Sequence, residues 1–259
     1  MSPSTTHHSL SVLAIAALMS VGTTMAAAPS SAAVVAQPKS IQNVKETDQR
    51  MPAKNKGGWQ LAKATITDAS LPRVLLIGDS ILSAYRPRVA KALKGKANVD
   101  GWITPIHHGS PNILAQFKEV IAEGPYTVIH FNLGLHGYQK GRIPAGQYIP
   151  LTKQLVEQIR ASAPKAKIIW ASTTPILQKG VVDAVDPELN PVIIDHNALA
   201  AQVMAEYQIP VNDLYTLMLP HLHWRAGKTD QFHWQAPAYD VMAKAVVECV
   251  EKALQQPAK

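Results

Sequence analysis

The side chains best suited to nucleophilic chemistry in this sequence lie far apart along the chain. Ser80 closes the tripeptide Gly78-Asp79-Ser80, which comes directly after a short apolar run, and His233 follows Asp230 by three positions in the segment KTDQFHWQAP. A serine hydroxyl becomes a useful nucleophile when an imidazole accepts its proton and a carboxylate orients that imidazole. The residue types therefore fit acyl transfer, provided that the fold brings them together.

Each of these motifs also has a plain structural interpretation. Gly-Asp-Ser is ordinary turn chemistry, and an aspartate at the position of Asp230 can cap a helix while a nearby histidine stays exposed. The same spacing allows a turn that places the Asp230 carboxylate beside Nδ1 of His233 and leaves Nε2 to face a serine. Taken one at a time, the motifs leave both interpretations open.

The elements that must position these residues alternate along the chain. Continuous rather than alternating apolarity indicates strands buried on both faces, and strands that alternate with helical segments predict a parallel sheet covered on both sides. We expect a loop or short turn between Ser80 and the first helix, with Pro87 at the first helical position. Strands are expected over residues 73–79, 97–105, 127–134, 166–175 and 209–214, and helices over residues 87–94, 112–123, 147–163, 191–207 and 237–254.

The carboxyl ends of the expected strands indicate where a ligand site would lie. In open parallel sheets, ligands bind outside that edge. Ser80, Gly109, Asn132, His136 and Thr173 all fall at the ends of strand-like runs or just after them. The sequence therefore predicts that these residues share one rim of the sheet.

Together the motifs form a recognisable series. Gly-Asp-Ser at residues 78–80 opens it and Asp-x-x-His at residues 230–233 closes it, with Tyr239 after the histidine and Ala238 where a glycine is common. Between and around them stand YRPRVAKALKGKANV, IHFNLGLH, WASTTPI and HNALAAQVMAEYQIPVNDLY. In this order and spacing, residues 73–254 resemble the SGNH (GDSL-type) hydrolases, a superfamily of secreted and intracellular esterases.

The resemblance implies a serine hydrolase that needs no cofactor and no metal. It makes Ser80 the nucleophile, His233 the general base and Asp230 its orienting partner. Gly109, in HHGSPN, matches the glycine of the family's second block, whose backbone N–H helps hold the oxyanion together with the backbone N–H of Ser80. The implied fold is a three-layer α/β sandwich around a central, mainly parallel five-stranded sheet of the flavodoxin-like type.

The chain departs from the family in the third block. Most members have Gly-x-Asn-Asp there, and the asparagine side chain is the third oxyanion donor. This chain has Gly134-Leu135-His136-Gly137 instead. Since an imidazole N–H can also donate, we expect His136 to be the third donor, with Asn132 as its rival.

The other chemically notable side chains receive plainer interpretations. Trp234, next to His233, is the aromatic residue expected to form a wall of the substrate site. His221 and His223 have a spacing that suits a pair of metal ligands, but the sequence supplies no third ligand, so we expect a loop that faces solvent or substrate. Cys249 is the only cysteine, which excludes an intramolecular disulfide.

The N-terminal part of the chain is typical of an exported protein. Residues 9–21 are apolar but too few to span a membrane easily, and Ala-x-Ala-like cleavage points follow between residues 26 and 33. This pattern predicts a signal peptide over residues 1–28, a flexible segment over 29–71 and a hydrolase domain over 72–256. The leader has no Lys or Arg, so an uncleaved anchor is the alternative to a secreted or periplasmic protein without a stable membrane span.

Composition narrows the possible partners. The chain has 259 residues and a formal net charge of +7, which permits attraction to acidic polymers. It has no stripe of Lys and Arg with interleaved aromatic residues, so nucleic acid is not an expected partner. We expect an esterase that removes a short acyl group, typically acetyl, from an extracytoplasmic substrate such as a carbohydrate. The alternatives are a lipase or thioesterase, an acyltransferase on the same triad, and a non-catalytic ligand-binding protein on a hydrolase fold.

Overall fold

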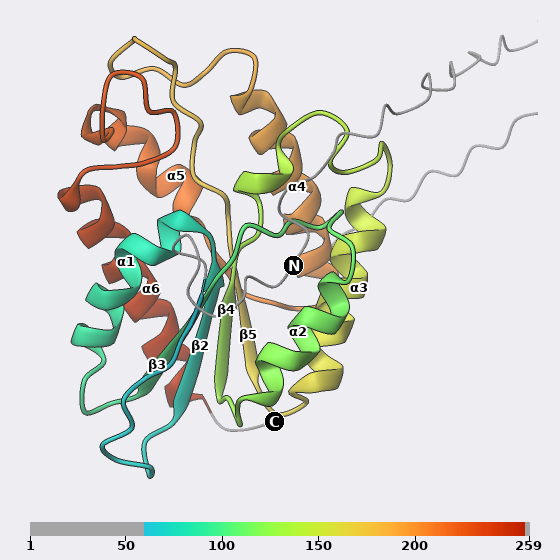
Figure 1. Ribbon diagram of the computed structural model, residues 1–259, viewed down its shortest axis with the longest axis vertical. Coiled ribbons are helices and arrows are strands. Elements are labelled where there is room, and N and C mark those ends of the chain that lie inside the picture. The colour runs from blue at the N-terminus through green and yellow to red at the C-terminus, as the bar shows by residue number, and fades with distance from the viewer. Residues whose placement is uncertain (1–59, 257–259) are drawn as a thin grey trace, which may run out of the picture. The chain divides into compact units, whose positions relative to one another are not determined.

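A six-stranded sheet lies at the centre of the computed structural model, which describes residues 60–256 (Figure 1). The predicted signal peptide and most of the predicted flexible segment lie outside the described residues. The strand order is β1-β3-β2-β4-β5-β6, and every neighbouring pair is parallel except β1 and β3. The strands are β1 Gln60–Ala62, β2 Arg73–Gly78, β3 Asn98–Ile103, β4 Val128–Phe131, β5 Lys167–Ala171 and β6 Val211–Asn212.

Helices cover both faces of the sheet and complete the predicted three-layer sandwich. α1 and α6 pack together on one face, while α2, α3 and α4 lie side by side on the other (Figure 1). Five strands and five helices fall within a few residues of the predicted segments, apart from the start of the first helix. The helices are α1 Ser80–Ala92, α2 Ile113–Ala122, α3 Tyr148–Ser162, α4 Asn190–Glu206, α5 Leu214–Met218 and α6 Ala236–Gln255, with the short 3-10 helices η1 Leu135–Gly137 and η2 Leu219–Trp224.

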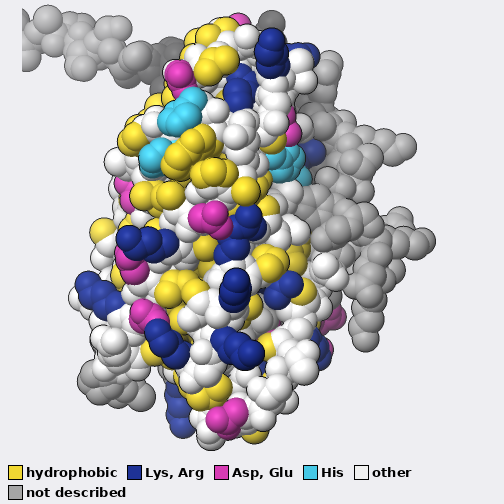
Figure 2. All heavy atoms as spheres, turned by 90° about the vertical axis from the view of Figure 1, so that its left-hand side faces the viewer, with side chains coloured by type: hydrophobic (Ala, Val, Ile, Leu, Met, Phe, Trp, Pro, Cys, Tyr) yellow, Lys and Arg dark blue, Asp and Glu magenta, His cyan; other side chains and the backbone are white. Residues whose placement is uncertain are grey.

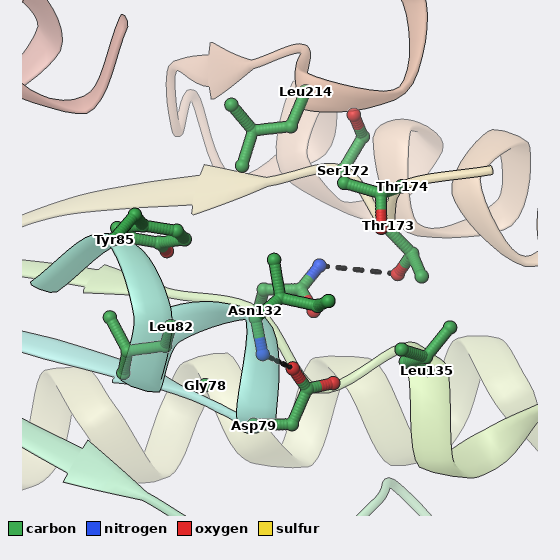
Figure 3. Close-up of a pocket in the computed structure, with 11 residues that line it drawn as sticks. Gly78, Asp79, Leu82, Tyr85, Asn132, Leu135, Ser172, Thr173, Thr174 and Leu214 are labelled. Carbon is green, nitrogen blue, oxygen red and sulfur yellow. Dashed lines mark hydrogen bonds between the residues drawn. The ribbon is translucent and has the colours of Figure 1, made fainter. Parts of the chain in front are cut away.

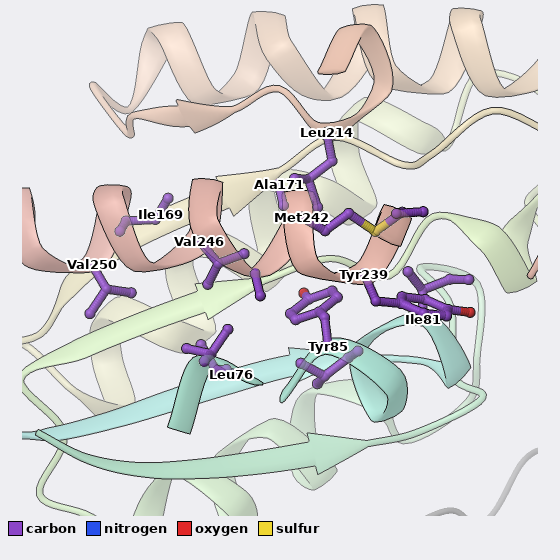
Figure 4. Close-up of a cluster of buried hydrophobic side chains, with 14 of the residues drawn as sticks. Leu76, Ile81, Tyr85, Ile169, Ala171, Leu214, Tyr239, Met242, Val246 and Val250 are labelled. Atoms are coloured by element: carbon purple, nitrogen blue, oxygen red, sulfur yellow. The ribbon is translucent and has the colours of Figure 1, made fainter. Parts of the chain in front are cut away.

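Two apolar clusters, one on each face, hold the layers together. Successive side chains of a strand point to opposite faces, so Leu76 joins the cluster under α6 while Leu75 and Ile77 join the cluster on the other face. Figure 4 shows Leu76 between the sheet and α6, which contributes Met242 and Val246. All five side chains are fully buried, and each contributes roughly 1.5–3 kcal/mol by leaving water.

The sheet has one strand more than predicted, because β1 pairs antiparallel with β3 at the sheet edge. The buried carboxylate of Asp100 holds β1 and the residues after it against the sheet. It accepts hydrogen bonds of 2.8 Å from the backbone N–H of Ala64 and from the hydroxyl of Tyr126, and it pairs with Arg73. A strand of three residues leaves no periodic pattern in the sequence, and β1 lies within the segment predicted to be flexible.

Helix α1 begins earlier than predicted. Asp79 is its N-cap, and Oδ1 accepts the backbone N–H of Ile81 at 2.9 Å. Ser80 is therefore the first residue of the helix, without an intervening loop, and Pro87 lies inside the helix instead of at its start. The cap satisfies one free N–H of the first turn and leaves that of Ser80 without an acceptor inside the helix.

The described surface shows no dominant charge of one sign on the face that carries α1 and α6. Figure 2 shows Lys and Arg side chains scattered there among acidic and apolar ones, with histidines gathered towards the upper part of the view. Within residues 60–256, no helix combines the length and the apolarity needed to cross a membrane.

Candidate active site

The site lies where the connections of the sheet diverge. β2 leads through α1 to β3 on one side, and β4 leads through α3 to β5 on the other. Such a switch point leaves a crevice at the carboxyl ends of the two strands, which is where open α/β sheets bind ligands. Ser80 follows β2 and His136 follows β4, as the rim prediction requires.

Ser80, His233 and Asp230 form a continuous hydrogen-bonded chain. Ser80 Oγ lies 2.9 Å from His233 Nε2, and His233 Nδ1 lies 2.9 Å from Asp230 Oδ2. The His233 side chain is 41% exposed, and Ser80 and His233 line the same pocket, where a ligand can reach them. With Asp230 ionised, Nδ1 carries the proton and Nε2 is free to accept one from the serine. The structure thus brings together the three residues that the sequence predicted as a triad.

The Asp230 carboxylate is itself held in place by the backbone. Its Oδ1 accepts the N–H groups of Phe232 and His233, both at 2.9 Å. Partial burial acts to raise the pKa of Asp230, but these backbone bonds and the His233 ring together hold that pKa below the usual aspartate value. The Asp230 carboxylate is therefore an anion at neutral pH.

Arg225 holds the loop that carries Asp230, a role that the sequence does not predict. Its guanidinium is buried, and Nη2 donates to the Asp230 carbonyl at 2.7 Å while Nε donates to the Gly227 carbonyl at 2.9 Å. Nη1 donates to the Gln178 carbonyl at 2.7 Å, which ties the loop to the segment that follows β5. A single arginine in a polar loop has no pattern that separates it from a solvated one, so sequence alone offered no signal.

His136 lies in the pocket over the triad. It lines this pocket together with Ser80 and His233, and it lies near the Asp79 carboxyl beneath. Burial raises the pKa of Asp79, while the nearby rings of His136 and His233 act in the opposite direction. This position fits the predicted role of His136 as a side-chain donor to a ligand held at Ser80.

The rival donor Asn132 is occupied in the scaffold. Its amide Nδ2 donates to Thr173 Oγ1 at 3.1 Å (Figure 3) and to the Ala171 carbonyl at 2.7 Å, and its Oδ1 accepts the Gly134 N–H at 3.2 Å. A Cβ at Gly134 would lie 1.6 Å from Thr173 Oγ1, so this close approach requires glycine. Because both amide hydrogens are used to join the ends of β4 and β5, the geometry favours His136 over Asn132.

Comparison with known proteins agrees with this arrangement. The model of the GDSL-like Lipase/Acylhydrolase family matches residues 76–241. The chain belongs to this family. It is accordingly a hydrolase of ester bonds, and the predicted resemblance is confirmed. The comparison with curated proteins gave no match.

Solved structures of this hydrolase's relatives share its fold at low identity. A carbohydrate esterase family 3 protein from Talaromyces cellulolyticus is 14% identical with a TM-score of 0.57, over 72% of this chain and 100% of that one. A member of the lipolytic G-D-S-L family from Veillonella parvula is 19% identical with a TM-score of 0.54, over 70% and 98%. The acetyl xylan esterase AlAXEase is 15% identical with a TM-score of 0.57, over 69% and 99%. These likenesses confirm the predicted α/β fold of the hydrolase.

Gly109, the other predicted backbone donor, does not line the pocket of the hydrolase at Ser80. Its N–H donates to His107 Nδ1 at 3.1 Å, and Gly109 lines a neighbouring cavity between α2 and α3. A Cβ at this position would lie 2.1 Å from the Arg142 carbonyl oxygen, so the loop requires glycine here. The described conformation therefore uses the Gly109 N–H within its own loop.

The pocket over the triad has a volume of about 370 Å³. Its apolar wall comes from Tyr138 and Phe232, whose ring centroids lie 5.6 Å apart. The prediction that Trp234 forms a wall of the substrate site was wrong, because Trp234 is 3% exposed and packs in the core under α6. The full lining is Ser80, Leu135, His136, Tyr138, Gln139, Arg142, Phe232 and His233.

The two histidines with metal-like spacing are engaged elsewhere. His221 stacks on Trp224 with ring centroids 4.2 Å apart, and Nδ1 of His223 lies 3.6 Å from the Asp183 carboxylate. Among residues 60–256, no three His, Cys, Asp or Glu side chains are grouped so that they could hold a metal ion.

Proposed function

We propose that the protein is a serine esterase that removes a short acyl group, typically acetyl, from an extracytoplasmic carbohydrate. The observation that carries this proposal is the hydrogen-bonded chain from Ser80 through His233 to Asp230, which opens into a pocket. In the proposal, residues 72–256 are the hydrolase domain, and a signal peptide over residues 1–28 exports it.

The proposed reaction is a two-step acyl transfer. His233 Nε2 accepts the proton of Ser80 as Oγ attacks the ester carbonyl, and Asp230 stabilises the imidazolium that forms. The backbone N–H of Ser80 and the side chain of His136 stabilise the negative oxygen of the tetrahedral intermediate. His233 then protonates the leaving alcohol, and water releases the acyl group from Ser80 by the same steps. Gly109 would join the oxyanion site if its N–H released His107 Nδ1 and donated to the ligand instead.

The dimensions of the pocket favour a short acyl group. Among its described lining residues only Leu135, Tyr138 and Phe232 have apolar side chains, and its volume of about 370 Å³ is at the small end of the range for ligand pockets. The similarity to a carbohydrate esterase and to an acetyl xylan esterase supports an acetylated carbohydrate as substrate. A lipase, a thioesterase and an acyltransferase on the same triad are the alternative functions that an assay must separate.

A series of p-nitrophenyl esters from acetyl to decanoyl tests the acyl preference. We expect the highest kcat/KM for acetyl and a steady fall with chain length. A fluorophosphonate probe that labels the wild type but not Ser80→Ala identifies the nucleophile. Absence of labelling in the folded wild type, together with no turnover of any ester, would favour the non-catalytic ligand-binding protein.

A further inference from the structure

One side chain of the pocket carries a permanent charge that the triad does not use. Arg142 lines the pocket together with Ser80, His136 and His233. No Asp or Glu lines this pocket, and among the described residues no carboxylate forms an ion pair with Arg142. The two nearby aspartates are engaged with other groups, Asp230 with His233 and Asp79 with the start of α1. The pocket therefore presents a cation without a protein anion.

The guanidinium of Arg142 is only partly satisfied by the protein. Its Nη1 donates to the His136 carbonyl at 2.8 Å. Its Nε is buried without a hydrogen-bond partner, and Nη2 makes no hydrogen bond with any described residue. An arginine presents five N–H donors in a planar fork that matches the two oxygens of a carboxylate. Nε is buried and Nη1 is engaged, so Nη2 is the donor of this pocket-lining side chain that is open to an anionic ligand.

The loop around Arg142 fixes where that charge lies. The backbone N–H of Arg142 donates to the Gln139 carbonyl at 3.1 Å, and Gly141 has a φ of 87°, which closes the turn. The Arg142 carbonyl rests against Gly109, as described above. The backbone of Arg142 is therefore held on both sides, and the bond from Nη1 to the His136 carbonyl restrains the side chain, which reduces the entropy lost when the guanidinium binds a ligand.

We propose that Arg142 binds a carboxylate of the substrate, so that this enzyme prefers esters with an anionic group close to the scissile bond. The proposal rests on the esterase function and names a class of substrate for it. The carboxylate can belong to the acyl part, as in a hemiester of a dicarboxylic acid, or to the alcohol part, as in an acetylated uronic acid. The chemistry that recognises it is the same in both cases.

Matched pairs of esters test the proposal. On the acyl side, p-nitrophenyl hemisuccinate is compared with p-nitrophenyl butyrate, which has a chain of the same length without the charge. On the alcohol side, acetylated glucuronic acid is compared with acetylated glucose. The readout is the ratio of kcat/KM for the anionic ester to that for the neutral ester, in the wild type, in Arg142→Gln and in Lys140→Met. Lys140 is an exposed cation of the same loop that does not line the pocket, so its variant removes the same charge elsewhere.

In at least one pair, we expect the wild type to prefer the anionic ester by about tenfold or more, the size of one charge-assisted hydrogen bond. Arg142→Gln should bring that ratio close to one, mainly through KM, while Lys140→Met keeps it. The pair that shows the preference identifies the part of the substrate that carries the carboxylate. If Arg142 only supports the His136 loop, both esters of a pair lose the same factor and the ratio is unchanged, which would overturn the proposal. A wild-type ratio of one in both pairs would overturn it as well.

Calorimetry on Ser80→Ala separates this proposal from the esterase function, since that variant cannot turn over. We expect it to bind p-nitrophenyl hemisuccinate or acetylated glucuronic acid more tightly than the matched neutral ester, and the double variant with Arg142→Gln to lose this difference. A wild type that hydrolyses no ester would overturn the proposed function, whereas equal binding of charged and neutral esters by Ser80→Ala would overturn only the role of Arg142.

Discussion

The assignment of His136 as oxyanion donor and of Asn132 as scaffold predicts opposite effects for two alanine variants. His136→Ala removes a donor that acts on the charged intermediate, so it should lower kcat more than it raises KM. Loss of one such donor costs roughly 3 kcal/mol, on the order of a hundredfold in kcat. Its thermal midpoint should stay close to that of the wild type, because His136 lines a pocket and is only half-buried.

Asn132→Ala should act on stability instead. It removes the three hydrogen bonds that Asn132 makes to Ala171, Thr173 and Gly134. Ala171 and Thr173 are buried, so the acceptors left behind are cut off from water. At about 1 kcal/mol for each bond, the loss is roughly 3 kcal/mol, which corresponds to a fall in Tm of about 6–12 °C for a domain of this size.

Kinetics and thermal denaturation of three purified variants test this pair of expectations. His136→Asn restores the donor that most of the family uses, so it should recover part of the activity lost in His136→Ala. His223→Ala is the control for removal of a histidine outside the pocket, and it should change neither quantity. If His136→Ala keeps near-normal kcat while Asn132→Ala loses activity without losing stability, the donor is Asn132 and the reasoning fails.

Three further outcomes are expected. Ser80→Ala should lower kcat by about a millionfold with an unchanged fold; more than a few percent of residual turnover, with contamination excluded by active-site labelling, would remove Ser80 as nucleophile. Asp230→Asn should lower kcat by roughly ten-thousandfold by favouring the wrong imidazole tautomer; retention of its circular dichroism spectrum distinguishes this from unfolding, and normal turnover would contradict the triad. Burial lowers the pKa of His108 to about 3 and that of His130 to about 4, so both take up protons on unfolding below a pH of ~6.5. The free energy of unfolding should therefore fall as the pH drops from about 6 to 4, by up to ~1.4 kcal/mol per pH unit for each histidine. Urea titrations at several pH values should show a shallower fall for His108→Phe than for the wild type. Equal dependence on pH in the two proteins would refute the role of His108.

The sheet and its helices could be predicted because the strands are buried on both faces. Such strands appear in the sequence as continuous apolar runs, and the five parallel ones all lie within the predicted segments. β1 escaped prediction because its stability comes from contacts distant in sequence, above all from Asp100 to Ala64. The start of α1 was predicted too late because Gly-Asp-Ser was taken for a turn that precedes the helix. In the structure Asp79 ends the strand connection and is at the same time the N-cap of α1.

The triad could be predicted from residue types and order, whereas the pocket wall could not. Neighbouring residues in extended backbone point to opposite sides, and Trp234, which pairs with Arg225 in an isolated bridge, turns into the core beside His233. The bend before it brings Phe232 back to the pocket. The role of Arg225 and the acceptor of the Gly109 N–H both depend on carbonyl or ring positions that no residue type encodes.

The loops that carry the candidate site are held by polar side chains that bond mainly to the backbone. Asp79 caps α1 beneath Ser80, Asn132 joins the ends of β4 and β5, and Arg225 fixes the carbonyl of Asp230. Replacing any of these three would strand buried backbone groups, which is costly whatever the substrate. The bonds of Asn132, which stands before the third block, join the ends of β4 and β5. We therefore expect the exchange of the family's usual asparagine for His136 to alter the pocket over Ser80, which His136 lines, more than the joint between β4 and β5.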